Sequence, residues 1–302
     1  MGENIIKNID ILKLLKIVKE AGERVCHIYI MYKDFQIELK EDETPITIAD
    51  KESNEILTTG ITELYPEIPI LSEEGIIYPF EERKKWEYFW LIDPLDGTKE
   101  FILKNGQFTV AVSLIKNNKP VLGIIYLPVD DTFFFAYKGL GAFRVEGRVI
   151  KQDTNSLDYV LKHSLKLPIV SNKEKDKIKV VVSRSRFSKE TRRFVKILRK
   201  FYKDVEIIPV GGSLLKFCLL SEGYADIYPR LGSPVAEWDA AAGQIILEES
   251  GGKVIDLTTM ENITYNKENI KIPPFIAQRA DFQFPVPLEY IIELFEQNEI
   301  LD

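Results

Sequence analysis

Residues 88–101 read YFWLIDPLDGTKEF. The apolar run at the start of this segment is typical of a buried strand, which we expect to end at Asp93-Pro94. Asp96 follows three residues after Asp93, and the proline between them stiffens the chain. A short helix is predicted at 99–103, and the first N–H groups of a helix have no partner within it. The segment therefore predicts two carboxylates beside an anion-binding helix start.

Two further acidic clusters lie at predicted element boundaries. Glu73 follows a short strand at 69–71, and Asp239 opens a predicted helix at 240–249. Taken singly, such residues are ordinary turn or helix-capping residues. Taken together, carboxylates beside a helix start form an oxygen ligand set for Mg²⁺ next to a phosphate site. This combination predicts metal-assisted phosphoryl chemistry.

The period of the hydrophobic pattern changes along the chain. Helical spacing predicts a helix at 9–32 and a second helix from Asp50 through Glu63, with a polar turn at 40–45 between them. Alternation with a period of two predicts antiparallel strands at 108–115, 121–126 and 132–137. Strands and helices then alternate from 179 to 256, which is typical of an α/β layered domain.

Residues 151–178 are polar and lysine-rich and have no clear periodicity. We expect a solvated loop there that joins two domains, at residues 1–155 and 156–302. The length of 302 residues agrees with two domains.

The composition excludes several classes of protein. Hydrophobic residues make up 45% and charged residues 29%, as in an ordinary folded protein, and no apolar run is long enough to span a membrane. The net charge of −7 disfavours a nucleic-acid-binding surface. Cys26, Cys218, His27 and His163 have no zinc-site spacing, and the sequence shows no signal peptide, so we expect a reduced cytoplasmic protein.

Three motifs carry a resemblance to a known family. LIDPLDGT at 91–98 and EWDAAAG at 237–243 resemble the two signatures of the inositol monophosphatase superfamily, which comprises lithium-sensitive, Mg²⁺-dependent phosphatases. PITIAD at 45–50 is similar to an upstream element of that family. The resemblance spans about residues 10–285. It implies an α/β fold, a layered αβαβα sandwich, with the metal site between two domains.

Shorter segments resemble the 3'(2'),5'-bisphosphate nucleotidases of the CysQ type. These segments are TKEF at 98–101, NGQFTV at 105–110, SRSR at 183–186, GSLLKFC at 212–218 and ADIYPR at 225–230. That group removes the 3'-phosphate from adenosine 3',5'-bisphosphate. The resemblance leaves open whether the 5'-phosphosulfate relative of this nucleotide is also a substrate. It also leaves open whether the protein is a monomer or a homodimer.

The resemblance implies a role for each matched residue. Two or three Mg²⁺ ions are held by Glu73, Asp93, Asp96, Asp239 and the backbone carbonyl of Leu95. The attacking water is oriented and deprotonated by Asp50, Glu73 and Thr98. The nucleotide and its phosphates are bound by Gly97, Thr98, Ser183, Ser213, Lys216, Arg230 and Asp239.

Other readings stay open at this stage. The same chemistry could act on an inositol phosphate or on fructose 1,6-bisphosphate, although segments 98–101 and 213–218 speak against that. A non-catalytic phosphate- or metal-binding protein is disfavoured because every matched acidic position is filled. For single residues, Asp50 could be a helix N-cap, and Lys216 and Arg230 could form ordinary surface ion pairs.

Overall fold

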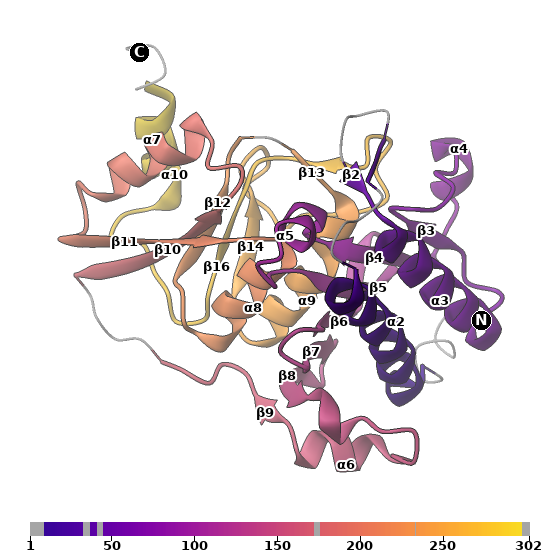
Figure 1. Ribbon diagram of the computed structural model, residues 1–302. Coiled ribbons are helices and arrows are strands. Elements are labelled where there is room, and N and C mark those ends of the chain that lie inside the picture. Colours follow the sequence, from indigo (N-terminus) through magenta and orange to yellow (C-terminus); the bar gives the residue numbers. More distant parts are fainter. Residues whose placement is uncertain (1–8, 33–36, 41–44, 172–175, 233, 298–302) are drawn as a thin grey trace.

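The computed structural model describes residues 9–32, 37–40, 45–171, 176–232 and 234–297 (Figure 1). The first part of the chain forms α2 (Ile11–Met31), β1 (Glu38–Leu39), β2 (Pro45–Ile46), α3 (Ile48–Leu64), β3 (Ile70–Ser72), α4 (Phe80–Arg83), β4 (Tyr88–Asp96), α5 (Thr98–Ile102), β5 (Thr109–Lys116), β6 (Lys119–Leu127), β7 (Thr132–Tyr137), β8 (Gly141–Glu146), the 3-10 turn η1 (Gly147–Val149), α6 (Leu157–Lys162) and β9 (Leu165–Lys166).

The rest of the chain alternates between strands and helices. It forms β10 (Lys177–Ser183), α7 (Lys189–Leu198), β11 (Asp204–Val210), α8 (Leu214–Glu222), β12 (Ile227–Arg230), β13 (Val235–Ala236), the 3-10 turn η2 (Glu237–Asp239), α9 (Ala241–Glu249), β14 (Lys253–Asp256), β15 (Lys271–Ile272), β16 (Phe275–Gln278) and α10 (Leu288–Gln297). Within the described residues, no helix combines the length and the apolar composition that crossing a membrane requires.

A seven-stranded sheet forms the core of the first part, in the order β3-β4-β5-β6-β7-β8-β9. One face is covered by α2 and α3, because α2 has its apolar residues on a single side. Leu14, Leu15 and Val18 of that side are fully buried against the sheet. Asp10 caps the helix by accepting a hydrogen bond of 3.0 Å from the backbone N–H of Lys13.

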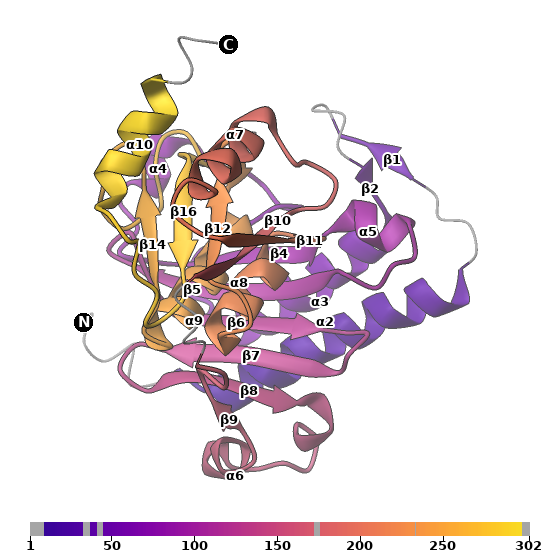
Figure 2. The ribbon, with the colours of Figure 1, turned by 90° about the vertical axis from the view of Figure 1, so that its left-hand side faces the viewer.

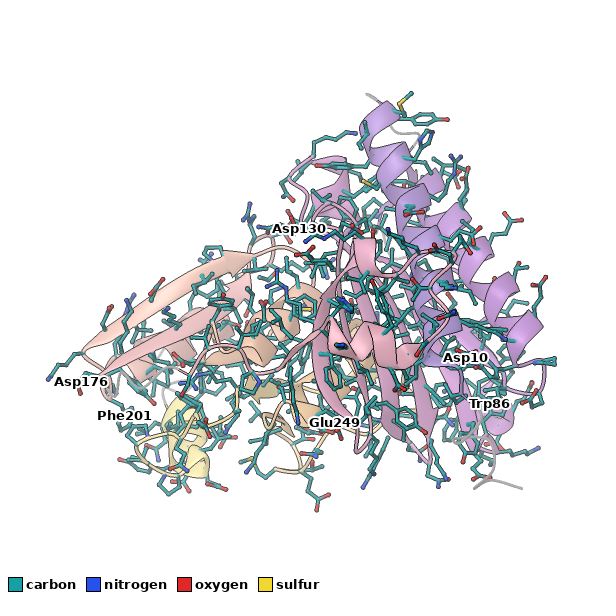
Figure 3. The ribbon with its side chains drawn as sticks, turned by 90° about the horizontal axis from the view of Figure 1, so that it is seen from below. Asp10, Trp86, Asp130, Asp176, Phe201 and Glu249 are labelled. Atoms are coloured by element: carbon teal, nitrogen blue, oxygen red, sulfur yellow. The ribbon has the colours of Figure 1, made fainter. Side chains whose placement is uncertain are left out.

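A five-stranded sheet forms the core of the second part, in the order β11-β10-β12-β16-β14. Its outer face packs against α7 and α10, and its inner face packs against α8 and α9. The other side of α8 and α9 contacts the seven-stranded sheet. The layers therefore run helix, sheet, helix, sheet, helix (Figures 1 and 2). Figure 3 shows Asp176 and Phe201, at one end of the second sheet, on the opposite side of the molecule from Asp10.

The predicted αβαβα sandwich is thus confirmed, and parallel pairing at one sheet edge prepares the site. β3 runs parallel to β4, with Ser72 beside Ile92. The residues that follow these two, Glu73 and Asp93, consequently emerge at the same end of neighbouring strands. β4 does not end at Asp93, as the sequence suggested, but continues through a β-bulge to Asp96. The bulge changes the direction in which the two aspartates point.

The described residues of segment 151–178, at 151–171 and 176–178, contain more secondary structure than the sequence predicted. The segment contains α6, and β9 hydrogen bonds with β8, so residues 165–166 extend the first sheet. Lysines interrupt the short apolar patterns of α6 and β9, so the hydrophobic periodicity did not predict these two elements. The domain division at 155/156 stays a prediction. Of the polar turn expected at 40–45, residues 41–44 lie outside the described residues.

Candidate active site

A cleft of about 530 Å³ lies between the two parts of the molecule. Elements of both parts line it, because β4 and α5 come from the first part and α8, β12 and η2 from the second. Its walls include all but one of the residues singled out in the sequence: Glu73, Asp93, Leu95, Asp96, Gly97, Thr98, Ser183, Ser213, Lys216, Arg230 and Asp239. Asp50 lies behind Thr98, to which it is hydrogen-bonded.

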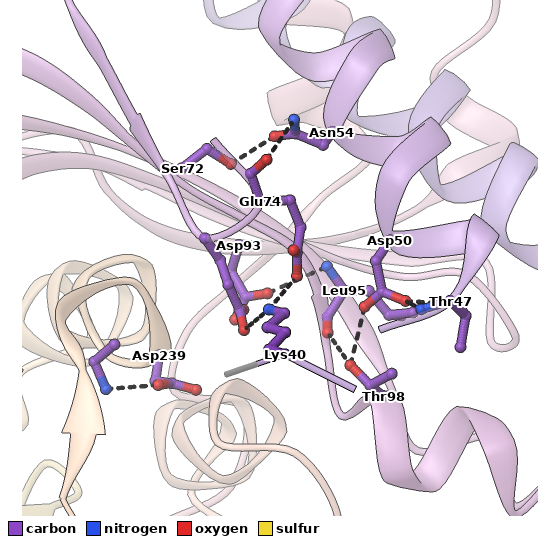
Figure 4. A network of polar contacts seen from close by, with 12 residues as sticks. Lys40, Thr47, Asp50, Asn54, Ser72, Glu74, Asp93, Leu95, Thr98 and Asp239 are labelled. Atoms are coloured by element: carbon purple, nitrogen blue, oxygen red, sulfur yellow. Dashed lines mark hydrogen bonds and ion pairs between the residues drawn. The ribbon is translucent and has the colours of Figure 1, made fainter. Parts of the chain in front are cut away.

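Three carboxylates converge in this cleft. Asp93, Asp96 and Asp239 each offer one oxygen, and these oxygens all lie within 4.8 Å of one another. Figure 4 shows Asp239 facing Asp93 from the other part of the chain. We call these three side chains the acidic wall. Sequence positions nearly 150 residues apart are therefore brought to one point.

The two aspartates of β4 differ in their partners. Asp96 accepts hydrogen bonds from the backbone N–H groups of Ser213 (2.9 Å) and Leu214 (2.7 Å), so it caps the start of α8. Asp93 accepts a bond of 3.2 Å from the Leu95 N–H through Oδ1. Its other oxygen, Oδ2, is buried and has no hydrogen-bond partner within the described part of the chain.

The acidic wall is electrostatically strained. Burial, together with the charges of Glu73, Asp96 and Asp239, raises the pKa of Asp93 well above its ordinary value. Burial also raises the pKa of Asp96, against the hydrogen bonds from the start of α8. Burial, Asp96 and Glu73 raise the pKa of Asp239 to about 7. Repulsion from Glu73 thus disfavours the charged form of all three carboxylates, and repulsion from Asp96 also disfavours that of Asp93 and Asp239.

These residues fit a divalent cation. Carboxylate oxygens are the ligands that hard cations such as Mg²⁺ prefer, and a bound cation would relieve the repulsion within the wall. The unpartnered Oδ2 of Asp93 supports this fit, because a buried polar atom without a partner is costly. Asp93, Asp96 and Asp239 could hold the ion, and Leu95 lines the same cleft.

Thr98 and Asp50 form a hydrogen-bonded pair beside the wall (Figure 4). The Thr98 hydroxyl lies 3.0 Å from Asp50 Oδ1 and 3.3 Å from the Leu95 carbonyl oxygen. Asp50 Oδ2 accepts bonds from the N–H and hydroxyl of Thr47, at 2.7 and 2.6 Å. Thr47, rather than Asp50, is therefore the N-cap of α3. Burial raises the pKa of Asp50, although its hydrogen bonds with Thr47 and Thr98 oppose the shift.

Glu73 has a cationic partner that the sequence did not suggest. Lys40 Nζ lies 2.9 Å from Glu73 Oε1 and also contacts the Glu74 carboxylate. Burial disfavours the charge of Lys40, but the two carboxylates outweigh it and raise the pKa of Lys40. Lys40 stands in a polar, charge-rich segment that looks like a solvated turn, so nothing in its local pattern marks it.

Two glycines allow the backbone to approach the wall. Gly97 has φ of 96°, and a Cβ there would come within 2.9 Å of the Gln107 carbonyl oxygen. Gly212 has φ of 59°, and a Cβ there would lie 2.8 Å from Asp96 Oδ2. Both positions therefore need glycine. They set the start of α5 and of α8 beside the carboxylates.

Two cations, Lys216 and Arg230, line the same cleft, and we call them the basic wall. Lys216 is 1% and Arg230 8% exposed, so the alternative of surface ion pairs is wrong. Burial lowers the pKa of Lys216 to about 8, against the charge of Asp96. Its Nζ contacts the Gly212 carbonyl, and Arg230 Nε has no hydrogen-bond partner among the described residues.

The two serines predicted to bind the nucleotide, Ser183 and Ser213, lie in the same cleft. Ser183 ends β10, and its Oγ accepts a bond of 3.1 Å from the Arg186 N–H. Ser213 precedes α8. Arg186 also lines the cleft, although in the sequence it is distinguished only as part of the SRSR motif at 183–186. Its exposure on a loop gives no pattern by which sequence alone could select it.

Comparison with known proteins agrees with this geometry. The 3'(2'),5'-bisphosphate nucleotidase CysQ of Haemophilus influenzae is 35% identical over 275 residues, which cover 90% of this chain and 93% of that protein. The crystal structure of CysQ from Bacteroides thetaiotaomicron has a TM-score of 0.80 and 36% identity, with 90% of this chain and 97% of that chain covered.

A more distant structure shares the fold. The inositol monophosphatase of Anabaena has a TM-score of 0.64 and 23% identity, with 94% of each chain covered. The model of the inositol monophosphatase family matches residues 10–284. This chain therefore belongs to the inositol monophosphatase family.

Proposed function

We propose that this protein is a metal-dependent 3'(2'),5'-bisphosphate nucleotidase that hydrolyses the 3'-phosphate of adenosine 3',5'-bisphosphate. One observation carries the proposal: a single cleft is lined both by three clustered carboxylates that could hold a cation and by two buried basic side chains. A substrate with one phosphate would need only the cation site and not the two basic side chains. The bisphosphate nucleotidases at about 35% identity over most of the chain support the same substrate class.

The acidic wall, Glu73 and the Leu95 carbonyl would hold two or three Mg²⁺ ions. Such cations lower the pKa of water and offset the charge on the leaving oxygen. Asp93 Oδ2 is free to bind, because no group of the described chain occupies it. Asp96 keeps further lone pairs although both its oxygens accept bonds from the start of α8.

Thr98 and Asp50 form the route for the proton of the attacking water. The Thr98 hydroxyl donates a hydrogen bond to Asp50 Oδ1, so the lone pairs of Thr98 Oγ1 are left to accept a proton from the water. As Thr98 Oγ1 takes a proton from the water, it passes its own proton to Asp50. The raised pKa of Asp50 makes it a better proton acceptor than an exposed aspartate. Glu73 can act as a second acceptor, since it lines the same cleft.

The backbone N–H groups of Gly97 and Thr98 would bind the reacting phosphate beside the acidic wall. Lys216 and Arg230 would bind the second phosphate, with Ser183 and Ser213 as hydroxyl contacts. Arginine binds phosphate in a forked geometry, and lysine acts as a point charge. Binding to a dianion would reverse the loss of charge that burial favours at Lys216.

We also infer a cytoplasmic location. Both cysteines, Cys26 and Cys218, are free thiols, which agrees with a reducing compartment.

Phosphate release with Mg²⁺ tests the proposal. Adenosine 3',5'-bisphosphate, inositol 1-phosphate and fructose 1,6-bisphosphate are compared, each with and without lithium. We expect preferential, lithium-sensitive release from the nucleotide. Preference for inositol 1-phosphate or the sugar phosphate would keep the metal chemistry but contradict the nucleotide assignment.

A further inference from the structure

Three buried polar residues connect the two parts of the molecule a short distance from the acidic wall. Arg83 ends α4 in the first part, whereas Asn266 and Glu237 belong to the second. They are 2%, 5% and 0% exposed. We call them the Arg83–Asn266–Glu237 clamp.

Arg83 and Asn266 hold each other in both directions. The Arg83 guanidinium donates to Asn266 Oδ1 at 3.0 Å, and Asn266 Nδ2 donates to the Arg83 carbonyl at 2.6 Å. The same guanidinium donates to the carbonyls of Lys267 (3.1 Å) and Glu268 (3.3 Å). Asn266 has φ of 61°, a left-handed conformation that asparagine tolerates better than most residues.

Glu237 extends this contact to the metal-ligating turn. Its carboxylate accepts bonds from the backbone N–H groups of Asn266 (2.8 Å) and Lys267 (3.0 Å). Glu237 begins η2, the single turn that ends at Asp239. The Asp239 carboxylate is itself fixed by a bond of 2.8 Å from the Ala236 N–H. A continuous path of hydrogen bonds therefore leads from Arg83 to the turn that carries Asp239.

Arg83 also lies a short distance along the chain before the other two carboxylates, Asp93 and Asp96. β4 begins at Tyr88, five residues after Arg83, and carries Asp93 and Asp96. The clamp thus joins the segment that leads into β4 to the segment that presents Asp239. Without a cation, the three carboxylates repel one another, so some other contact must keep Asp239 near the aspartates of β4.

The geometry points to the clamp as the device that positions Asp239 for the cation before it binds. A preformed set of ligands binds a cation more tightly, because the side chains do not have to lose conformational entropy when the cation binds. Arg83, Asn266 and Glu237 are not among the residues that line the cleft, so they act as positioning residues. This inference rests on the metal dependence in the proposed function and not on the choice of nucleotide.

Matched substitutions test the clamp. Arg83→Lys keeps the charge but removes the forked donors, and Glu237→Gln keeps the shape but leaves one backbone N–H without an acceptor. Arg279→Lys is the control. Arg279 is also buried, and its Nε lies 2.6 Å from Asp226 Oδ1. Asp226 directly precedes β12, whereas Arg230 is the last residue of that strand. The measurements are Mn²⁺ binding by electron paramagnetic resonance without substrate, and metal-free Tm.

We expect Arg83→Lys and Glu237→Gln to raise the Mn²⁺ Kd about 10- to 100-fold, as loss of groups that orient metal ligands does. The KM for Mg²⁺ should rise with it, and kcat at saturating Mg²⁺ should change little. Arg279→Lys should lower Tm and leave the Kd unchanged.

The inference is wrong if the clamp variants lower Tm like Arg279→Lys and leave the Kd unchanged. If Arg83→Lys does not fold, Glu237→Gln alone decides. Unaltered protein that binds no Mn²⁺ would contradict the metal site and the clamp together. Unaltered protein that binds Mn²⁺ but prefers another substrate would contradict only the nucleotide assignment.

Discussion

The acidic and basic walls of the cleft are opposite in charge but alike in their energetics. Burial raises the pKa of Asp93 and Asp239 and lowers that of Lys216. Burial thus disfavours the charged form of Asp93 and Asp239 in one wall and of Lys216 in the other, and a ligand of the opposite sign would favour it. Each wall has a side chain with a backbone partner and one buried atom without a partner within the described residues: Asp96 and Lys216 contact the backbone, whereas Asp93 Oδ2 and Arg230 Nε have no partner. We therefore propose that the acidic wall binds a metal ion and that the basic wall binds a phosphate group of the substrate.

The largest effect is expected at the acidic wall. Asp93→Asn should lower kcat/KM by more than about 100-fold. Loss of a residue that only orients a metal ligand costs up to about 100-fold, and loss of a ligand itself should cost more. Metal-free Tm should not fall, because one charge of a repelling set is removed. Asp256→Asn is the control, since the Asp256 side chain is also buried but, among the residues described, its carboxylate accepts hydrogen bonds from Thr258 alone. Steady-state kinetics that gave Asp93→Asn near-normal rates would refute the cation assignment.

Thr98 separates catalysis from metal binding at the same wall. Thr98→Ala removes the hydroxyl between water and Asp50, and should lower kcat about 100-fold, within the usual range for general acid–base groups. Thr98→Ser keeps the hydroxyl and should retain most of the activity. Calorimetric titration should give similar Mg²⁺ affinities for both variants. A common loss of Mg²⁺ affinity would instead make Thr98 part of the cation site.

Lys216 tests the basic wall alone. Lys216→Met should raise KM for adenosine 3',5'-bisphosphate about 10- to 100-fold, as loss of one charged hydrogen bond does. The KM for adenosine 3'-monophosphate should change far less, because it has no second phosphate. Lys203→Met, at an exposed lysine paired with Asp176, should leave both values unchanged. Equal effects of Lys216→Met on both substrates would remove Lys216 from the second-phosphate role.

The smallest effect is a pH dependence of stability. The pKa of Asp239 is raised from 3.8 to about 7 in the folded protein. Its protonated form therefore favours folding, and this contribution is full below about pH 4 and lost as the pH rises through 7. When the pH is raised from 5 to 8 without metal, the Tm of the unaltered protein should fall by about a few degrees relative to the Tm of Asp239→Asn. A difference that does not vary with pH would contradict this reading of Asp239.

The sequence predicted the acidic wall better than the basic wall for a physical reason. Asp93 and Asp96 follow a buried strand within one short segment, so local pattern alone places them together. Lys216 and Arg230 meet only because α8 and β12 pack side by side, and no local pattern indicates that they are buried. The family resemblance, rather than periodicity, marked both residues.

Other features needed the three-dimensional structure. The bulge in β4 depends on pairing with β5, which sequence alone does not specify. Lys40 reaches Glu73 from a distant segment, and the Arg83–Asn266–Glu237 clamp joins residues more than 150 positions apart. Long-range polar contacts of this kind leave no periodic signal in a single sequence.

The most direct test of the two-wall account is the identity of the product formed from adenosine 3',5'-bisphosphate. Phosphorus NMR distinguishes adenosine 5'-phosphate from adenosine 3'-phosphate. If the acidic wall receives the 3'-phosphate while the basic wall keeps the 5'-phosphate, the sole nucleotide product is adenosine 5'-phosphate. Accumulation of adenosine 3'-phosphate, or of both products in similar amounts, would contradict the assignment of the two walls.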